Sequence, residues 1–371
     1  MEPFNYTRLE LARRRRGLTK GALAEAAEIS ARNLTAYEKH EYEPNEETIA
    51  GLAAAVGFPS EFFFGPDLDE PTKEGASFRA MTRMPARVRE QALSSGALAF
   101  ALSDWIESRF GLPEPHVPEF EGLEPEVAAD AVREAWGLGE KRIGNMVHLL
   151  EAHGIRVFSL VEESTKVDAF SQWRGATPYV FLNTTKSAER SRMDAAHELG
   201  HLVLHGHGGP QGREAEHEAQ AFGSAFLMPA GSVRAKAPRN GRFDQLVRAK
   251  YKWKVSVANL AYRMNKLGML TDWQYRSVFV ELNRRGGRDK EPNPPGVEPL
   301  PREQSQVLEK VFRALRKDDV SKALIARDLA IPLADLNDSV FGLVMTPLEG
   351  GAGGPVRPDS PPPIPRHLRV L

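Results

Sequence analysis

The stretch AAHELGHLVLH, residues 195–205, constrains this chain more than any other, because it places His197 and His201 four positions apart. On an α-helix, four residues advance about 6 Å and about 40° of rotation, so both imidazoles leave one face and can share one metal ion. Glu198 lies beside that face, where a carboxylate can take a proton from a metal-bound water. The stretch therefore predicts a helix with a metal site and a catalytic base. The simpler alternative is an amphipathic helix that happens to carry histidines.

A catalytic zinc ion usually has three protein ligands, so a third ligand is needed. The chain has no cysteine, which leaves histidine, aspartate and glutamate as the available ligand types. The next predicted helix offers four such residues, although a run like this can also be a solvated acidic face. They are Glu214, Glu216, His217 and Glu218. His205 continues the spacing of four, but it lies about 12 Å along the axis from His197. We expect His205 to support the ligands rather than bind the same ion.

Length and composition favour a protein of several domains. The chain has 371 residues, more than a typical single core contains. Its 41% apolar and 27% charged residues are ordinary for globular proteins, and a net charge of −1 excludes a surface that is basic throughout. The N-terminus lacks the apolar core of a signal peptide, and no apolar run reaches the roughly 18 residues that span a membrane. We expect a cytoplasmic protein without membrane contact.

Apolar residues recur at intervals of three and four along most of the chain, which predicts a mainly helical protein. Within the first 65 residues such positions would form one small core. These positions are Leu9, Leu23, Ala24, Ile29, Leu34, Ile49, Leu52 and Val56. Thr19 and Ser30 stand where helix N-caps are expected. Short strands are expected at 154–160, 167–175 and 177–183, before the helix that carries the histidines.

The first helices resemble an XRE-type helix-turn-helix domain over residues 6–58, with GLT before the second helix, IS opening the third and YE within it. The resemblance implies that residues 1–65 bind double-stranded DNA, with the third helix in the major groove. The implied DNA contacts are Arg32, Asn33 and Thr35 near base edges, and Lys20 and the run Arg13–Arg16 near phosphates. Such domains often act as dimers on paired half-sites, so a homodimer is expected as one arrangement. Residues 1–60 hold 8 Lys and Arg against 9 Asp and Glu, which keeps docking of a protein partner as the alternative.

DAAHELGHLVLH followed by EAEHEAQAFGSAFLMP resembles the ImmA/IrrE metallopeptidase family, and the resemblance covers about residues 140–280. It implies one zinc ion per chain, held by His197, His201 and Glu216, with Glu198 as the catalytic base. Glu218 remains the competing third ligand.

The chain departs from that family at two positions of the second helix. Gln220 stands where Asn or Asp is usual, and Gly223 stands where Ala is usual. The first position would support a ligand histidine through a hydrogen bond, which Gln220 can still accept. TPYVFLN, residues 177–183, resembles the family's edge strand, and we expect it to hold an extended substrate by backbone pairing. Stabilisation of the oxyanion is open among Tyr179, His207 and His217.

These expectations describe a multidomain, mainly α chain with three folded parts. They are an N-terminal all-α helix-turn-helix, a central α+β zincin-like metallopeptidase domain and a C-terminal helical module. The predicted boundaries are 1–65 for the DNA-binding domain, 66–139 for a linker and helical connector, 140–283 for the metallopeptidase domain, 284–301 for a second linker, 302–346 for the C-terminal module and 347–371 for a disordered tail. The sequence of the C-terminal module repeats the helix–turn–helix pattern of the N-terminal domain. Because Asp328, Asp335 and Asp338 oppose entry into a DNA groove, we expect it to pack or to dock a partner.

The function expected from these features is a zinc-dependent endopeptidase coupled to a DNA-binding domain in transcriptional regulation. The resemblance implies that it cleaves a helix-turn-helix repressor in response to stress, either in trans or in its own chain at a linker such as residues 64–78. The alternative is a DNA-binding regulator or antitoxin whose peptidase-like domain is a sensor or dimerisation platform with little catalysis. The intact set of ligands and Glu198 favours the enzyme, because a non-catalytic fold needs no general base. Gln220, which replaces the usual Asn or Asp, favours the alternative with little catalysis.

Overall fold

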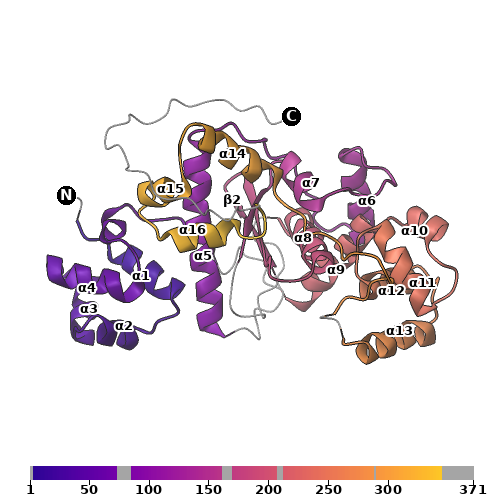
Figure 1. Cartoon of the computed structure of the whole chain (residues 1–371), viewed down its shortest axis with the longest axis horizontal. Coiled ribbons are helices and arrows are strands. Elements are labelled where there is room, and N and C mark those ends of the chain that lie inside the picture. Colours follow the sequence, from indigo (N-terminus) through magenta and orange to yellow (C-terminus); the bar gives the residue numbers. More distant parts are fainter. Residues whose placement is uncertain (1–2, 73–84, 161–168, 207–211, 288–289, 345–371) are drawn as a thin grey trace.

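The computed structural model describes residues 3–72, 85–160, 169–206, 212–287 and 290–344. Within these ranges the chain is mostly helical, with one small sheet near its middle (Figure 1). The predicted mainly α architecture with a central α+β part is therefore confirmed. No helix in the described ranges is both long enough and apolar enough to cross a membrane. The predicted tail at 347–371 lies outside the described residues, and so do residues 73–84 of the predicted linker and connector at 66–139.

The N-terminal helices pack around one small apolar core. Their bounds are α1 Tyr6–Arg15, α2 Lys20–Ala26, α3 Ala31–Glu38, α4 Glu46–Val56 and the 3-10 helix η1 Ser60–Phe64. The side chain of Thr19 accepts a hydrogen bond from the amide of Ala22, and that of Ser30 accepts one from Asn33, so both predicted N-caps are confirmed. The predicted core positions are buried, except for Ile29, which is half-buried.

The sheet has the strand order β1-β3-β2, so β3 is its central strand. The strands are β1 Arg156–Ser159, β2 Ala169–Arg174 and β3 Thr177–Leu182. The prediction that residues 177–183 form an edge strand is therefore wrong. A tight turn pairs β2 antiparallel with one side of β3, while β1 pairs parallel with the other side. Strand order depends on this non-local pairing, which the composition of one strand does not reveal.

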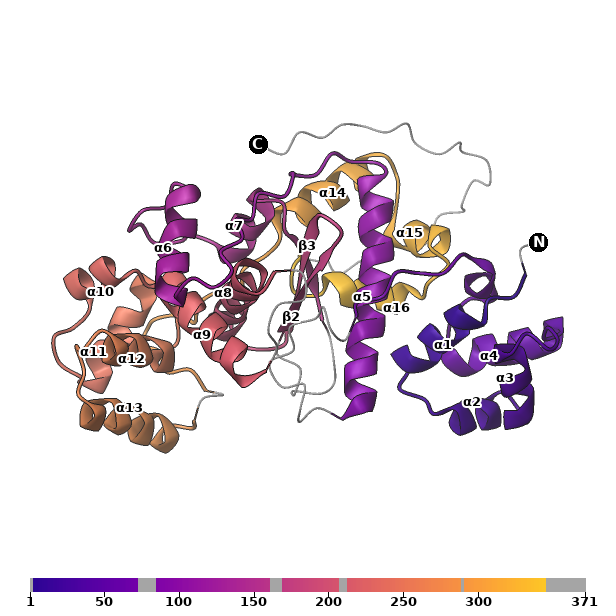
Figure 2. The same cartoon turned by 180° about the vertical axis from the view of Figure 1, so that it is seen from behind.

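Two long helices cover the two faces of the sheet, α5 (Ala86–Glu107) and α8 (Ala188–Leu204). Phe100 of α5 lies 4.6 Å from Tyr179 and 5.9 Å from Phe181 between ring centroids, so these β3 side chains face α5. Ser171 and Trp173 of β2 reach the backbone of α8 from the opposite face. Seen from behind, the strands lie between the two helices (Figure 2). Alternation along the strands thus directs one set of side chains towards the helix with the histidines.

The central part has further helices besides α8, of which those at residues 125–135, 146–152 and 213–227 pack against it. The further helices are α6 Pro125–Ala135, α7 Met146–Ala152, α9 Arg213–Leu227, α10 Ala230–Lys236, α11 Phe243–Ala249, the 3-10 helix η2 Lys250–Lys252, α12 Val257–Lys266 and α13 Asp272–Arg284. Lys250 is fully buried, and its ammonium lies 2.7 Å from a carboxylate oxygen of Glu189 and 3.0 Å from one of Glu291. Glu291 belongs to the second predicted linker, so this ion cluster ties that segment to the first turn of α8.

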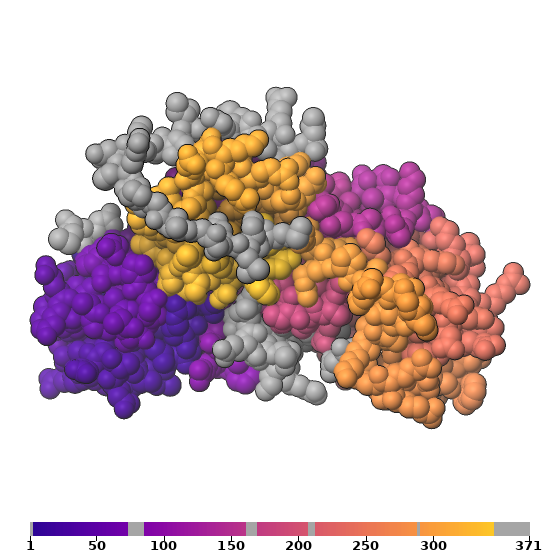
Figure 3. Space-filling model, in the orientation of Figure 1, coloured from indigo at the N-terminus to yellow at the C-terminus, as the bar shows by residue number. Residues whose placement is uncertain are grey.

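The C-terminal helices pack against the central part and the N-terminal helices. They are α14 Gln306–Lys317, α15 Lys322–Asp328 and α16 Leu333–Val340. α16 contacts α5 and β1, and in the space-filling view the C-terminal part lies between the N-terminal helices and the central helices (Figure 3). The packing role expected for this module agrees with these contacts.

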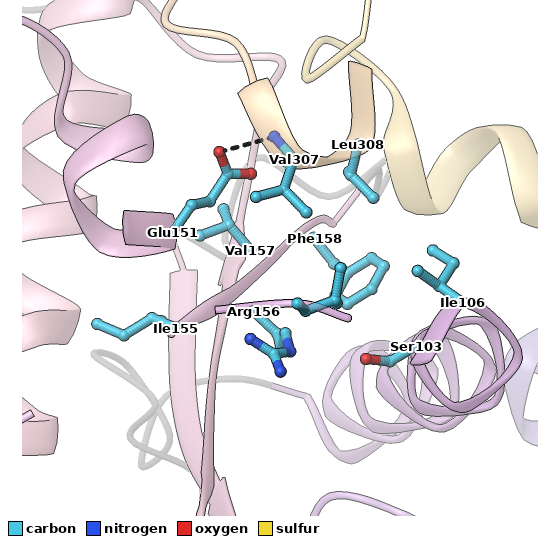
Figure 4. Close-up of a pocket in the computed structure, with 10 residues that line it drawn as sticks. Ser103, Ile106, Glu151, Ile155, Arg156, Val157, Phe158, Val307 and Leu308 are labelled. Atoms are coloured by element: carbon cyan, nitrogen blue, oxygen red, sulfur yellow. Dashed lines mark hydrogen bonds between the residues drawn. The ribbon is translucent and has the colours of Figure 1, made fainter. Parts of the chain in front are cut away.

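Glu151 of α7 joins the central part to the start of α14. Its carboxylate accepts hydrogen bonds from the amides of Gln306 and Val307, at 2.9 and 3.2 Å, beside a small pocket (Figure 4). The hydroxyl of Ser305 donates a third hydrogen bond to it. Burial raises the pKa of Glu151 to about 7, although these donors oppose the shift. A buried carboxylate thus satisfies amides that the first turn of a helix leaves without partners.

Candidate metal centre and nucleic-acid interface

The two histidines of the opening motif lie on a helix that is buried along most of its length. His197 is 1% exposed and His201 is 7% exposed. Helix α9 lies close against this part of α8, and two glycines permit the approach. A Cβ atom on Gly200 would lie 3.1 Å from the Cα of Ala219, and one on Gly223 would lie 3.0 Å from the amide nitrogen of His197. The departure from alanine at position 223 therefore brings α9 against the backbone of the metal-site helix.

Three side chains converge where these helices meet. The Nε2 atoms of His197 and His201 are 3.1 Å apart, and each lies 3.4 Å from a carboxylate oxygen of Glu216. Around a tetrahedral zinc ion with bonds of about 2.1 Å, ligand atoms are separated by about 3.4 Å. The two imidazoles each face one oxygen of the Glu216 carboxylate, and the ligand atoms of the three residues lie within 4.8 Å of one another, a spacing compatible with a single zinc ion. Within the described residues, this is the group of histidines and carboxylates that meets the geometry of a metal site.

The electrostatics of this group favour an ionised carboxylate. Burial alone would raise the pKa of Glu216, but hydrogen bonds and charge attraction from His197 and His201 outweigh burial and hold that pKa well below its usual range. The Glu216 side chain is 20% exposed, so the cluster opens to solvent on its side. An anionic ligand beside two imidazoles is a donor set that zinc prefers.

Glu198 is 1% exposed and receives a hydrogen bond from the neighbouring strand. The hydroxyl of Ser171 in β2 lies 2.8 Å from Oε2 of Glu198 and 3.2 Å from its backbone oxygen. Sequence analysis missed Ser171. Its position in register with Val180, on the face of β2 that meets α8, is the signal that could have found it.

His205 and Glu218 form a second pair beside the cluster. Nδ1 of His205 lies 2.9 Å from Nδ1 of His201, and Nε2 of His205 lies 2.9 Å from a carboxylate oxygen of Glu218. Burial lowers the pKa of His205 more than Glu218 raises it. The structure thus places Glu216 at the histidine pair and Glu218 against His205. Gln220, one turn beyond Glu216 on α9, is half-buried.

One of the residues considered for oxyanion stabilisation lies away from the cluster. Tyr179 faces α5, on the side of the sheet away from α8, and its hydroxyl lies 3.2 Å from the hydroxyl of Ser103. Tyr179 therefore cannot reach a substrate at the histidines. His217 is exposed on α9. His207 lies outside the described residues.

The residues expected near base edges lie on α3. Arg32 and Thr35 are exposed on α3, and Asn33 is half-exposed, with its side-chain oxygen 2.8 Å from the hydroxyl of Ser30. The ammonium of Lys20 forms a 2.6 Å ion pair with Glu38. Both partners are exposed, so this pair contributes little stability and can exchange for another anion.

The arginine run that was expected near phosphates is instead paired with carboxylates. The ion pairs are Arg13 with Glu10 at 2.6 Å, Arg14 with Glu70 at 2.6 Å, Arg15 with Asp335 at 2.8 Å and Arg16 with Asp335 at 2.7 Å. Asp335 belongs to α16, and its side chain is 1% exposed. Two of these arginines therefore hold the N-terminal helices to the C-terminal helices, which the sequence did not predict.

Comparison with known proteins gives two matches to family models. A model described as an IrrE N-terminal-like domain, of the M78 peptidases, matches residues 150–265. A model described as a helix-turn-helix domain matches residues 7–61. No curated protein matches the chain. The chain thus joins a helix-turn-helix domain to an IrrE N-terminal-like domain, the fusion that the two sequence resemblances indicated.

Proposed function

We propose that this protein is a zinc-dependent endopeptidase that acts in transcriptional regulation. The observation that carries the proposal is the convergence of His197, His201 and Glu216, whose ligand atoms lie within 4.8 Å of one another. These three residues would hold one zinc ion per chain. A zinc ion held there would supply Lewis acidity towards the scissile carbonyl and the attacking water.

Glu198 is the general base of this proposal. It takes the proton from the attacking water and returns it to the leaving amine, so it must be held in one rotamer. Ser171 supports that rotamer with its 2.8 Å hydrogen bond.

The central position of β3 in the sheet argues against backbone pairing of a substrate with residues 177–183. Thr72 donates its amide to the side chain of Gln172 in β2, so a segment from before α5 lies beside this strand. Ser171 places this strand directly beside Glu198.

We infer the substrate class from the fused helix-turn-helix domain and the family match. It is a helix-turn-helix repressor, cleaved in trans or within this chain, in response to a stress signal. The test is a comparison of protein N-termini in cells with and without the zinc-loaded protein. New N-termini should appear in a DNA-binding protein or in this chain, disappear with a chelator and return with zinc. Their absence in a zinc-loaded protein under every stress applied would favour a DNA-binding regulator or antitoxin with little catalysis.

We propose that residues 1–65 bind double-stranded DNA through α3. Replacing Arg32 and Asn33 together by alanine should weaken binding about 30-fold to 10,000-fold, because two base contacts of roughly 1–3 kcal/mol each are lost. The measurement is a titration against a duplex that the wild-type protein selects from a random pool, at fixed salt. Arg234→Ala, which removes an exposed charge on α10, is the control. Affinity of the double variant equal to that of the control would refute this assignment.

A further inference from the structure

We propose that His205 and Glu218 form a hydrogen-bonded relay that fixes the tautomer and orientation of His201 and thereby sets the affinity for zinc. The inference rests on the proposed metal site and goes beyond it, because neither residue binds the ion. The relay runs from the Glu218 carboxylate to Nε2 of His205, then from Nδ1 of His205 to Nδ1 of His201, with 2.9 Å at each step.

Counting the protons assigns every donor and acceptor in this relay. Nε2 of His201 faces the other two proposed ligands, at 3.1 Å from Nε2 of His197 and 3.4 Å from Glu216, so as a ligand it must offer a lone pair. A neutral imidazole then carries its proton on Nδ1, which donates to Nδ1 of His205. His205 accepts there, so its own proton lies on Nε2 and is donated to Glu218. With both rings neutral, this is the single arrangement that satisfies both hydrogen bonds.

The relay has a direct consequence for the metal site. A histidine ligand that donates its second N–H to an acceptor is held in one ring orientation and becomes a better electron donor to the metal. Here the acceptor is an imidazole that is itself polarised by a carboxylate. His201 is therefore oriented before a metal ion arrives, which lowers the cost of binding.

The burial of His205 supports a role beyond filling space. Its imidazole is 7% exposed, and a buried polar ring is costly unless its nitrogen atoms form hydrogen bonds. The imidazole is not needed to end the helix here, because the backbone amide of His205 donates a hydrogen bond to the carbonyl of His201. Both ring nitrogens are used, one towards the metal ligand and one towards Glu218.

The register between two helices explains why the relay and the metal site occur together. His205 follows His201 by one turn on α8, and Glu218 follows Glu216 by two positions on α9. Gly200 and Gly223 permit the close approach that fixes this register. One packing arrangement thus positions the third ligand and the relay carboxylate at once.

The test measures zinc affinity of the full chain by competition with a chromophoric chelator. Glu218→Ala and His205→Phe should each weaken zinc binding about 10-fold to 100-fold. Glu218→Gln should retain most of the affinity, because an amide oxygen can accept the same hydrogen bond. The double variant should bind no more weakly than His205→Phe alone, since both changes break one relay. Glu214→Ala, on an exposed position of the same helix, is the control.

A second measurement needs no substitution and reads the tautomers directly. Long-range ¹⁵N–¹H correlation spectra of the zinc-loaded protein should show His201 protonated at Nδ1 and His205 protonated at Nε2. The opposite tautomer of His205, or a zinc affinity of Glu218→Ala equal to that of Glu214→Ala, would overturn the relay. Wild-type protein that binds no zinc would overturn the metal site itself, and the relay with it.

Discussion

Replacing Glu198 by glutamine is expected to reduce peptide hydrolysis by a factor of about 10² to 10⁴ and to leave zinc content unchanged. Glutamine keeps the shape of the side chain and can accept the hydrogen bond from Ser171, but it cannot take a proton from water. The loss should therefore appear in kcat rather than in metal binding. The measurement is the cleavage rate of the substrate that N-terminal profiling identifies, with zinc content determined on the same preparation.

The matched control for this prediction is Glu214→Gln, which makes the same chemical change at an exposed position of α9. We expect that variant to cleave at the wild-type rate. Cleavage by Glu198→Gln within threefold of this control would show that Glu198 is not the general base. Loss of zinc from Glu198→Gln would show instead that its carboxylate holds the metal site together.

Replacing Asp335 by alanine is expected to destabilise the folded chain by about 3–5 kcal/mol. The Asp335 carboxylate is 1% exposed and pairs with Arg15 at 2.8 Å and Arg16 at 2.7 Å. Without it, the Arg15 guanidinium, which is 9% exposed, would lose its 2.8 Å ion pair, while the longer 3.2 Å pair with Asp338 would remain. A buried charge that loses its main partner is costly, so the contact between α1 and α16 should open first.

This second prediction is checked by urea unfolding together with hydrogen exchange of the α1 and α16 amides. Asp328→Ala is the control, because Asp328 lies in the same module, is 36% exposed and is 4.0 Å from Arg109. An exposed pair of this kind contributes at most about 1 kcal/mol. Equal unfolding curves and equal exchange for the two variants would show that the buried ion pairs do not hold the N-terminal helices in place.

The parts of the site that depend on local spacing could be predicted from the sequence. Two histidines four positions apart share a face on any helix, so the placement of His197 and His201 needed no knowledge of the fold. The N-caps Thr19 and Ser30 are local in the same way. Such features depend on the dihedral angles within one segment, so they do not change with the elements that pack around it.

Features that depend on distant pairing could not be predicted. The sequence indicated that residues 177–183 form a strand, but its central position depends on β1 and β2, which pair from both sides. The partners of Arg15 and Arg16 lie about 320 positions away on α16, and nothing in the arginine run points to them. Likewise, the acidic run on α9 could not show that Glu216 meets the histidines while Glu218 meets His205. The rotation of α9 against α8 decides between them.

The central claim is that His197, His201 and Glu216 together bind one zinc ion. The most direct test is the zinc content per chain of the purified wild-type protein and of Glu216→Ala, by elemental analysis after reconstitution and dialysis. We predict about one zinc ion per wild-type chain and a much lower content in the variant, since a catalytic site relies on three protein ligands. No zinc in the reconstituted wild-type protein, or equal zinc in the two proteins, would contradict the claim.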